Sequence, residues 1–154
     1  MFVLENGAKK GEDPRLQAIS QAIRVVPHFP KQGIMFQDIT TLLLDHNAFK
    51  DTVDIFVDRY RDMDISVVAG VEARGFIFGS SIALGIGAKF VPLCKPGKLP
   101  GGTLSAAIRL LELAGAEVVE CACVIGLSDL KVRSKLNGKP LYILLEPRQP
   151  ENGY

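Results

Sequence analysis

The order of apolar and polar residues predicts helices and strands that alternate along the chain. The clearest helical segment extends from about residue 48 to residue 63, where large apolar side chains recur at intervals of three or four residues. That spacing places them on one face of an α-helix. The residues on this face are Phe49, Val53, Phe56, Tyr60 and Met63.

Two further helices are predicted from their ends as well as from their spacing. Asp13 is a capping residue that precedes Pro14, and proline is favoured at the first position of a helix. The helix that begins there must end before Pro27, because proline cannot continue a helix. Another helix is predicted over residues 104–114, where Gly115 is placed to end it.

Four continuous apolar runs also lie along the chain, at residues 66–71, 89–94, 118–125 and 140–146. Continuous runs, rather than alternating ones, are typical of parallel strands that are buried on both faces. Strands that alternate with helices predict an α/β fold with a parallel sheet. Because ligands of such sheets bind beyond the carboxyl ends of the strands, the loops at that edge are the candidates for function.

Composition and charge narrow the class of protein. The 154 residues are 47% hydrophobic and 23% charged with a formal net charge of +1, which indicates a globular domain and argues against a nucleic-acid or membrane partner. The chain has no apolar run of the roughly 18 residues that span a membrane and no secretory signal pattern, and its three cysteines favour a reducing compartment. One domain is predicted over 13–147, between a disordered N-terminus at 1–12 and a C-terminal tail at 148–154.

The loop after the first predicted strand has the sequence Gly-Val-Glu-Ala-Arg-Gly-Phe and carries Arg74 among small residues. A guanidinium at a strand-to-helix turn can bind a phosphate or pyrophosphate through two parallel hydrogen bonds. The alternative interpretation is a surface arginine that pairs with Glu72.

The loop after the second predicted strand, at 94–103, is rich in glycine and proline and carries Lys95 and Lys98. It ends in Gly102 and Thr103, directly before a predicted helix. Free N–H groups at the start of a helix favour anions, so this segment is a candidate phosphate site. The alternative is that Thr103 only caps the helix after a flexible glycine pair.

A third candidate is the loop predicted at 29–40, which is mostly hydrophobic but contains Gln37. Backbone amides and carbonyl groups beside Met35 and Phe36 could hold a planar ring between apolar side chains. The alternative is a loop that packs its apolar side chains into the core.

The histidines and cysteines are weaker candidates. The two histidines lie far apart in the sequence without partners at ligand spacing, so no metal site is predicted. Cys121 and Cys123 lie on one face of a predicted strand and are interpreted as small buried apolar residues. Cys94 lies at a strand end among lysines and is a candidate nucleophile, although no histidine is near it in the sequence.

Taken in order, these loops and their surroundings resemble adenine phosphoribosyltransferases, particularly those of plants. The similar segments extend over about residues 13–147 and include GVEARGFIFG, KFVPLCKPGKLPG and GGTLSAAIRLLELAGAEVVECACVIGL. The resemblance implies a type I phosphoribosyltransferase fold, with a parallel sheet flanked by helices and a small hood, usually in a homodimer. It also implies a cytoplasmic reaction of purine salvage, in which adenine and 5-phosphoribosyl pyrophosphate, bound with Mg²⁺, give AMP and pyrophosphate.

The resemblance also implies a role for particular residues. Arg74 and Lys98 match positions of pyrophosphate binding, and Gly102 and Thr103 match the end of the loop that holds the 5′-phosphate. The transition state resembles an oxocarbenium ion that loses pyrophosphate, so fixed cations and helix-start amides should supply most of its stabilisation. The hood segment that frames adenine is matched by Ile34, Met35, Phe36 and Gln37.

The chain departs from the family pattern at the junction of residues 101–102. In the family, Lys-Leu-Pro-Gly is followed by a flexible loop, an antiparallel hairpin and an apolar strand that ends in paired aspartates. No Asp-Asp pair occurs in this chain, so no catalytic residue is assigned. The fold should therefore lack one central strand and a hairpin, which leaves either a gap or a re-paired sheet. The alternative function is a non-catalytic truncated homologue or splice form that at most binds nucleotide weakly or pairs with a complete subunit.

Overall fold

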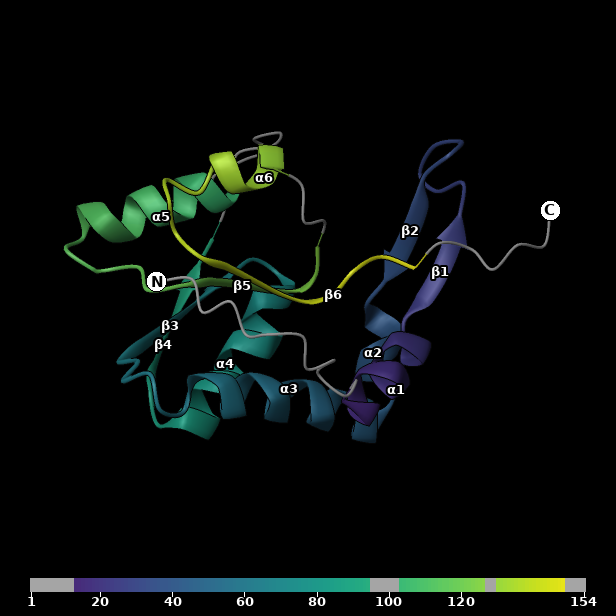
Figure 1. The fold of residues 1–154 in the computed structure, drawn as a ribbon, viewed down its shortest axis with the longest axis horizontal. Helices are drawn as coiled ribbons and strands as arrows, with labels where there is room; N and C mark the ends of the chain where they lie inside the picture. Colours follow the sequence, from purple (N-terminus) through teal and green to yellow (C-terminus); the bar gives the residue numbers. More distant parts are fainter. Residues whose placement is uncertain (1–12, 95–102, 127–129, 149–154) are drawn as a thin grey trace, which may run out of the picture. The chain divides into compact units, whose positions relative to one another are not determined.

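The computed structural model describes residues 13–94, 103–126 and 130–148, which form two compact units (Figure 1). The first unit comprises the described residues up to Thr52 together with Arg148, and the second extends over Val53–Pro147. The predicted disordered N-terminus and most of the predicted C-terminal tail lie outside the described residues. A single domain over 13–147 stays a prediction.

The first unit consists of short helices and one hairpin. Its first helix starts as predicted, because the Asp13 carboxylate accepts a hydrogen bond from the Arg15 N–H at 3.0 Å and Pro14 occupies the first turn. Ile19 and Ile23 are buried at this end of the chain. In chain order the elements are α1 (Pro14–Ala22), β1 (Arg24–Pro27), β2 (Met35–Asp38), α2 (Thr40–Leu43) and the start of α3 (His46–Tyr60).

The prediction of a loop over residues 29–40 is wrong for its second half. Met35–Asp38 form strand β2, which pairs antiparallel with β1 in a register that joins Pro27 to Met35 and Arg24 to Asp38. Each strand has only four residues, too few to show an alternating pattern of side chains in the sequence. Hydrogen bonds to the partner strand therefore decide this segment's conformation.

The predicted amphipathic helix is confirmed as α3, with different ends. It begins earlier than predicted, because the Asp45 carboxylate accepts a hydrogen bond from the Ala48 N–H at 3.0 Å and caps the first turn. It ends at Tyr60, so Met63 lies beyond the helix and is 38% exposed instead of contributing to the buried face. Phe56 and Tyr60 are buried as predicted.

The second unit contains the four predicted strands, and all of them pair in parallel. Strand β3 pairs with β4, and β5 pairs with β6, but the described strands form two separate two-stranded sheets. The missing block is expected to leave either a gap or a re-paired sheet. The described strands have not re-paired into one sheet. In chain order the elements are β3 (Val67–Val71), α4 (Arg74–Ile86), β4 (Lys89–Leu93), α5 (Thr103–Leu113), β5 (Cys121–Ile125), α6 (Leu130–Ser134) and β6 (Leu141–Leu145).

Helix α5 packs over β5 and ends where the sequence predicts. Gly115 adopts the left-handed conformation with φ +84°, which glycine favours at the end of a helix. Ile108 of α5, Cys121 of β5 and Leu136 form a buried apolar cluster beneath the helix. Across the described ranges, no helix combines the length and hydrophobicity that a membrane crossing requires.

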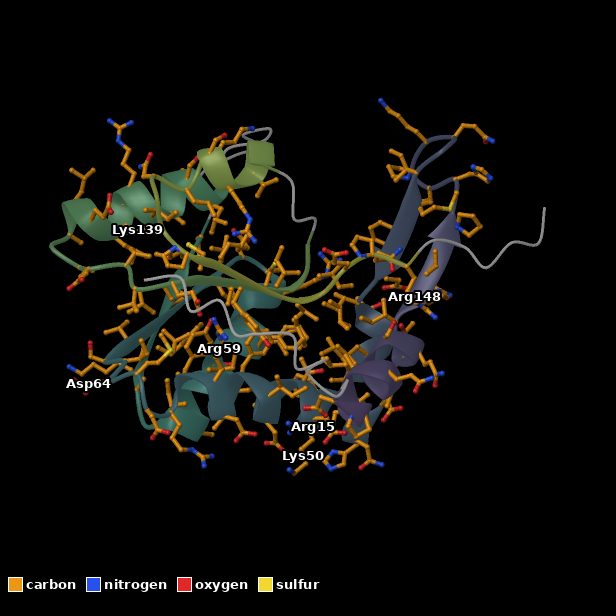
Figure 2. All side chains as sticks on the ribbon, viewed as in Figure 1. Arg15, Lys50, Arg59, Asp64, Lys139 and Arg148 are labelled. Atoms are coloured by element: carbon orange, nitrogen blue, oxygen red, sulfur yellow. The ribbon has the colours of Figure 1, made fainter. Side chains whose placement is uncertain are left out.

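A partly exposed ion pair joins Arg59 of α3, labelled in Figure 2, to Glu120, the residue before β5. The Arg59 guanidinium donates from Nη2 to Glu120 Oε1 at 2.7 Å and from Nε to Oε2 at 3.0 Å. The same guanidinium lies 3.8 Å from the centre of the Tyr142 ring on β6. Burial opposes ionisation of Glu120, but the hydrogen bonds and charge of Arg59 together with the Tyr60 hydroxyl outweigh it, and the pKa of this carboxyl lies below its usual value.

Candidate active site

The first unit presents the predicted adenine segment on the β1–β2 hairpin. Ile34 directly precedes β2 and is 44% exposed, while Met35 and Phe36 are half-buried. The Phe36 ring meets Phe29 edge-on, with the ring centroids 5.3 Å apart. The segment therefore keeps apolar surface open to solvent, contrary to the alternative in which it packs into the core.

The connection between the two strands is held by hydrogen bonds close to the aromatic pair. The Phe29 N–H donates to the Ile34 carbonyl at 3.1 Å, and the Gly33 N–H donates to His28 Nδ1 at 3.1 Å. Gly33 has φ +88°, a conformation that a side chain would strain. These bonds set the position of the exposed Ile34 relative to the strands.

The Gln37 side chain is engaged with its own chain. Its amide nitrogen donates hydrogen bonds to the Met35 carbonyl oxygen at 3.4 Å and to the Arg148 carbonyl oxygen at 3.3 Å. Arg148 also donates from its guanidinium to the Ile23 carbonyl, which fastens the end of the described chain to the hairpin unit. A ligand of Gln37 would thus compete with main-chain acceptors for the same amide group.

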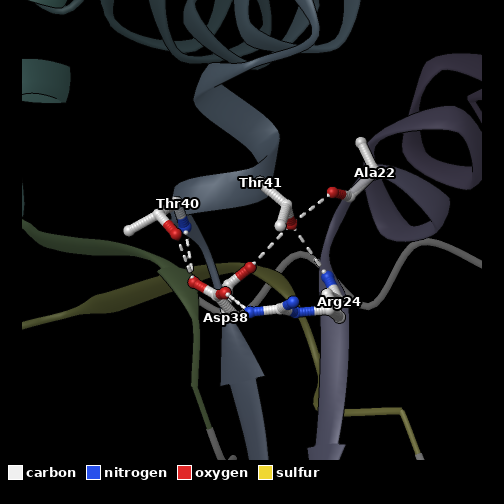
Figure 3. Close-up of polar contacts among 5 residues, drawn as sticks. All are labelled: Ala22, Arg24, Asp38, Thr40 and Thr41. Atoms are coloured by element: carbon white, nitrogen blue, oxygen red, sulfur yellow. Dashed lines mark hydrogen bonds and ion pairs between the residues drawn. The ribbon is translucent and has the colours of Figure 1, made fainter.

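Asp38 closes the base of the hairpin through a network of polar contacts (Figure 3). Its carboxylate accepts hydrogen bonds from the Thr40 hydroxyl and N–H and from Arg24 Nη2, the last at 2.8 Å. Thr41 adds a hydroxyl 2.7 Å from the Ala22 carbonyl oxygen. The Thr40 hydroxyl, supported by Arg24, holds the pKa of the Asp38 carboxyl below its usual value.

No role for Arg24, Thr40 or Thr41 is predicted from the sequence. The available signal is Asp38-Ile39-Thr40 ahead of a short helix, because an aspartate two residues before a helical N–H is a common capping arrangement. These hydrogen bonds direct the Asp38 carboxylate toward the protein and fix the position at which the hairpin leaves the helices.

The second unit contributes the turn from β3 to α4. The Glu72 N–H donates to the Leu93 carbonyl at 3.0 Å, which ties this turn to the end of β4, and the Glu72–Ala73 peptide bond is cis. Arg74 is the first residue of α4, and its side chain is exposed. Within the described ranges Arg74 forms no ion pair, so the alternative pairing with Glu72 is not present.

Glycines bring α4 very close to β3. A Cβ atom on Gly70 would lie 2.3 Å from the Gly75 carbonyl oxygen, and one on Gly79 would lie 2.9 Å from a ring carbon of Phe90. The contact at Gly70 is with backbone and requires glycine, whereas a Cβ atom at Gly79 would displace the Phe90 ring of β4. The glycine at position 70, next to a strand-to-helix turn, is a further signal in the sequence. The close approach fixes the start of α4, and with it Arg74, above the carboxyl end of β3.

The carboxyl ends of β3 and β4 lie at the same end of the sheet, because the two strands are parallel. Cys94, which is exposed, therefore lies at the same end of the sheet as Arg74. Thr103 is the first residue of α5, one position before the predicted start, whereas Lys95, Lys98 and Gly102 lie outside the described residues. The structure therefore describes one of the predicted phosphate-binding side chains, that of Arg74.

The remaining candidates are the cysteines Cys121 and Cys123 and any group of metal ligands. Cys121 is buried and Cys123 is half-buried, and burial raises the pKa of both thiols, as expected for structural rather than reactive cysteines. No group of three or more histidine, cysteine, aspartate or glutamate side chains in the described part of the chain could hold a metal ion. The described residues thus offer an exposed arginine and helix-start amides, which suit an anionic ligand.

No family model matches the chain, but individual proteins do. Adenine phosphoribosyltransferase 5 of Arabidopsis thaliana is 61% identical over 186 residues, with 96% of each chain covered. Among solved structures, the adenine phosphoribosyltransferase of Rhodothermus marinus is 33% identical with a TM-score of 0.74, over 86% of this chain and 98% of its own. That of Saccharomyces cerevisiae, crystallised with adenine and an imino-altritol bisphosphate, is 30% identical with a TM-score of 0.75, over 85% and 98%.

The alignment with the Arabidopsis relative is longer than the chain itself. It extends over 186 positions, 32 more than the 154 residues available, so at least that many positions face gaps in this chain. The placement of the gap at residues 101–102 stays a prediction. Identity of this extent over nearly the full length of both proteins shows that the chain belongs to the adenine phosphoribosyltransferase family.

Proposed function

We propose that this protein transfers the 5-phosphoribosyl group of 5-phosphoribosyl pyrophosphate to adenine, with AMP and pyrophosphate as products, in purine salvage. The observation that carries the proposal is the 61% identity to a plant adenine phosphoribosyltransferase over 96% of the chain. The exposed arginine at the start of α4 supports it, because the reaction requires a cation for a pyrophosphate leaving group.

The proposed roles of the residues follow the charge changes of the reaction. The bond between ribose C1 and the pyrophosphate oxygen breaks, a bond from C1 to an adenine ring nitrogen forms, and that nitrogen loses its proton. Negative charge thus develops on pyrophosphate, which Arg74 and Lys98 would bind, while Gly102 and Thr103 would hold the 5′-phosphate through helix-start amides. Stabilisation that grows as the leaving group departs accelerates the chemical step.

Adenine recognition is assigned to the hairpin segment. Ile34, Met35 and Phe36 would cover the faces of the ring with apolar side chains, and backbone groups would read its edge. Gln37 would contribute little direct recognition, because its amide already faces main-chain carbonyls.

Magnesium would reach this site on the substrate. Mg²⁺ would be bound by the phosphates of 5-phosphoribosyl pyrophosphate and would neutralise part of their charge. We also propose that the protein is cytoplasmic and forms a homodimer. The three unpaired cysteines support a reducing compartment such as the cytoplasm.

The test is AMP formation by the purified chain from adenine, 5-phosphoribosyl pyrophosphate and Mg²⁺. A matched version carries, at the junction of residues 101–102, the block that the Arabidopsis relative has opposite the gap. Turnover by both proteins supports the proposal. Turnover by the restored version alone contradicts it for this chain and supports the non-catalytic alternative.

A further inference from the structure

Strand β3 forms main-chain hydrogen bonds along one edge. At the two ends of its pairing with β4, the Lys89 N–H donates to the Ser66 carbonyl and the Glu72 N–H donates to the Leu93 carbonyl, both at 3.0 Å. In a parallel pair, the residues that bond to a given neighbour alternate along the strand. The even-numbered residues of β3 therefore face β4.

The odd-numbered residues of β3 present their N–H and C=O groups to the opposite edge. Within the described ranges no strand pairs with that edge, and no main-chain hydrogen bond reaches it. Since none of these groups has a main-chain partner among the described residues, the edge is a template for strand pairing. The residues that form this free edge are Val67, Ala69 and Val71.

The two strands of this sheet differ in the residues that protect an edge. β4 contains Lys89 and Pro92, and by the same alternation Pro92, which has no N–H to donate, faces away from β3. β3 has the sequence Val-Val-Ala-Gly-Val, without a charge, a proline or a bulge. Proteins place charges and prolines on exposed edges, so β4 is built as the edge of a sheet and β3 as an interior strand.

The packing of α4 agrees with an interior position for β3. The helix lies directly on this strand at Gly70, where a Cβ atom would lie 2.3 Å from the carbonyl oxygen of Gly75. Yet the sheet ends at β3 in the described chain, and a two-stranded sheet has little stability by itself. The relative's alignment has at least 32 positions opposite gaps in this chain, which is ample for a strand of about five residues and its connections.

We propose that the free edge of β3 binds an extended apolar segment of another polypeptide chain as a strand parallel to β3. The segment whose chemistry fits is the apolar strand that the family resemblance implies for the missing block, since an interior position requires aliphatic side chains on both faces. Its N–H and C=O groups pair with those of Val67, Ala69 and Val71. The inference is independent of catalysis, because strand binding is measured without substrates.

The first experiment uses a fluorescent peptide that copies the residues of Arabidopsis adenine phosphoribosyltransferase 5 opposite the gap. Fluorescence anisotropy is recorded as the purified full chain is added, and hydrogen exchange is measured with and without peptide. We expect saturable binding and slower exchange at the amides of Val67, Ala69 and Val71. The amides of Val68 and Gly70 serve as internal controls, because they already bond to β4.

Two variants locate the binding edge. Ala69→Pro removes an N–H that faces the free edge and spares the bonds to β4, so it should weaken peptide binding by about tenfold or more. Pro92→Ala, on the outer edge of β4, should leave the affinity unchanged. If Ala69→Pro does not fold, the exchange pattern of the unaltered chain decides the question.

The proposal is wrong if no saturable binding occurs up to about 1 mM chain. It is equally wrong if bound peptide leaves the exchange of the three free-edge amides unchanged, or if Ala69→Pro and Pro92→Ala bind with the same affinity. Sedimentation tests the competing occupant: self-association that Ala69→Pro abolishes, without peptide binding, would assign the edge to a second copy of this chain.

Discussion

Replacement of Arg59 by alanine tests the ion pair between Arg59 of α3 and the largely buried Glu120 carboxylate before β5. The Glu120 side chain is 9% exposed and that of Arg59 is 37% exposed, so Arg59→Ala leaves a carboxylate in the protein interior without its two hydrogen bonds. It also removes a cation 3.8 Å from the centre of the Tyr142 ring. Both losses fall on the folded state alone.

The expected loss follows from these two contacts. Removing one partner of a fully buried pair costs about 3–5 kcal/mol, and a desolvated cation–π contact is worth about 1–2 kcal/mol. Solvent reaches the guanidinium and screens it, which lowers both contributions. We therefore expect Arg59→Ala to lower the free energy of unfolding by about 3 kcal/mol, a large share of the stability of a domain this size.

The assay is urea denaturation followed by circular dichroism, with Arg61→Ala as the matched control. Arg61 lies two residues away and pairs with Asp58 at 3.7 Å, but the two side chains are 61% and 55% exposed. Its replacement should cost less than about 0.5 kcal/mol. A double-mutant cycle with Glu120→Ala should give a coupling energy of about 2 kcal/mol. Equal losses for the two arginine variants, or a coupling near zero, would refute the reasoning.

Four further predictions concern pH, packing and the proposed site. Because the pKa of Glu120 is lowered in the folded state, its ionised form adds stability above the unfolded value and loses it on acidification; the free energy of unfolding should fall below about pH 5, and less steeply in Glu120→Gln. Gly70→Ala should cost about 2–3 kcal/mol in urea denaturation, because backbone atoms of α4 must move; an unchanged midpoint would contradict the packing. Arg74→Ala should remove about 2–4 kcal/mol of transition-state stabilisation, measured as a lower kcat/KM, and an unchanged kcat/KM would exclude its pyrophosphate role. Gln37→Ala should raise the KM for adenine less than about fivefold, since its amide faces main-chain carbonyls; a loss of a hundredfold would show direct recognition.

Much of the fold could be predicted because local signals and tertiary contacts agree. The Asp13-Pro14 start of α1, the apolar face of α3 and the Gly115 end of α5 depend on neighbouring residues in the chain, and all three are confirmed. The four apolar runs also become parallel strands, but the expected burial on both faces is wrong for β4, whose residues are mostly exposed, and for Val67 of β3. The resemblance in the loops identified the family for the same reason: the motif residues are contiguous in the sequence.

The remaining features depend on partners that lie far apart in the sequence. Strand β2 exists because β1 supplies its hydrogen bonds, and the Asp38 carboxylate turns inward because Arg24 and Thr40 are placed to donate to it. The Arg59–Glu120 pair joins residues 61 positions apart, which no local pattern marks. Only the tertiary structure decided that β3 has no second strand neighbour among the described residues, since strand neighbours are chosen by the packing of the whole unit. The sequence by itself determined which segments form helices and strands and to which family they belong; long-range hydrogen bonds and close packing decided how those segments meet.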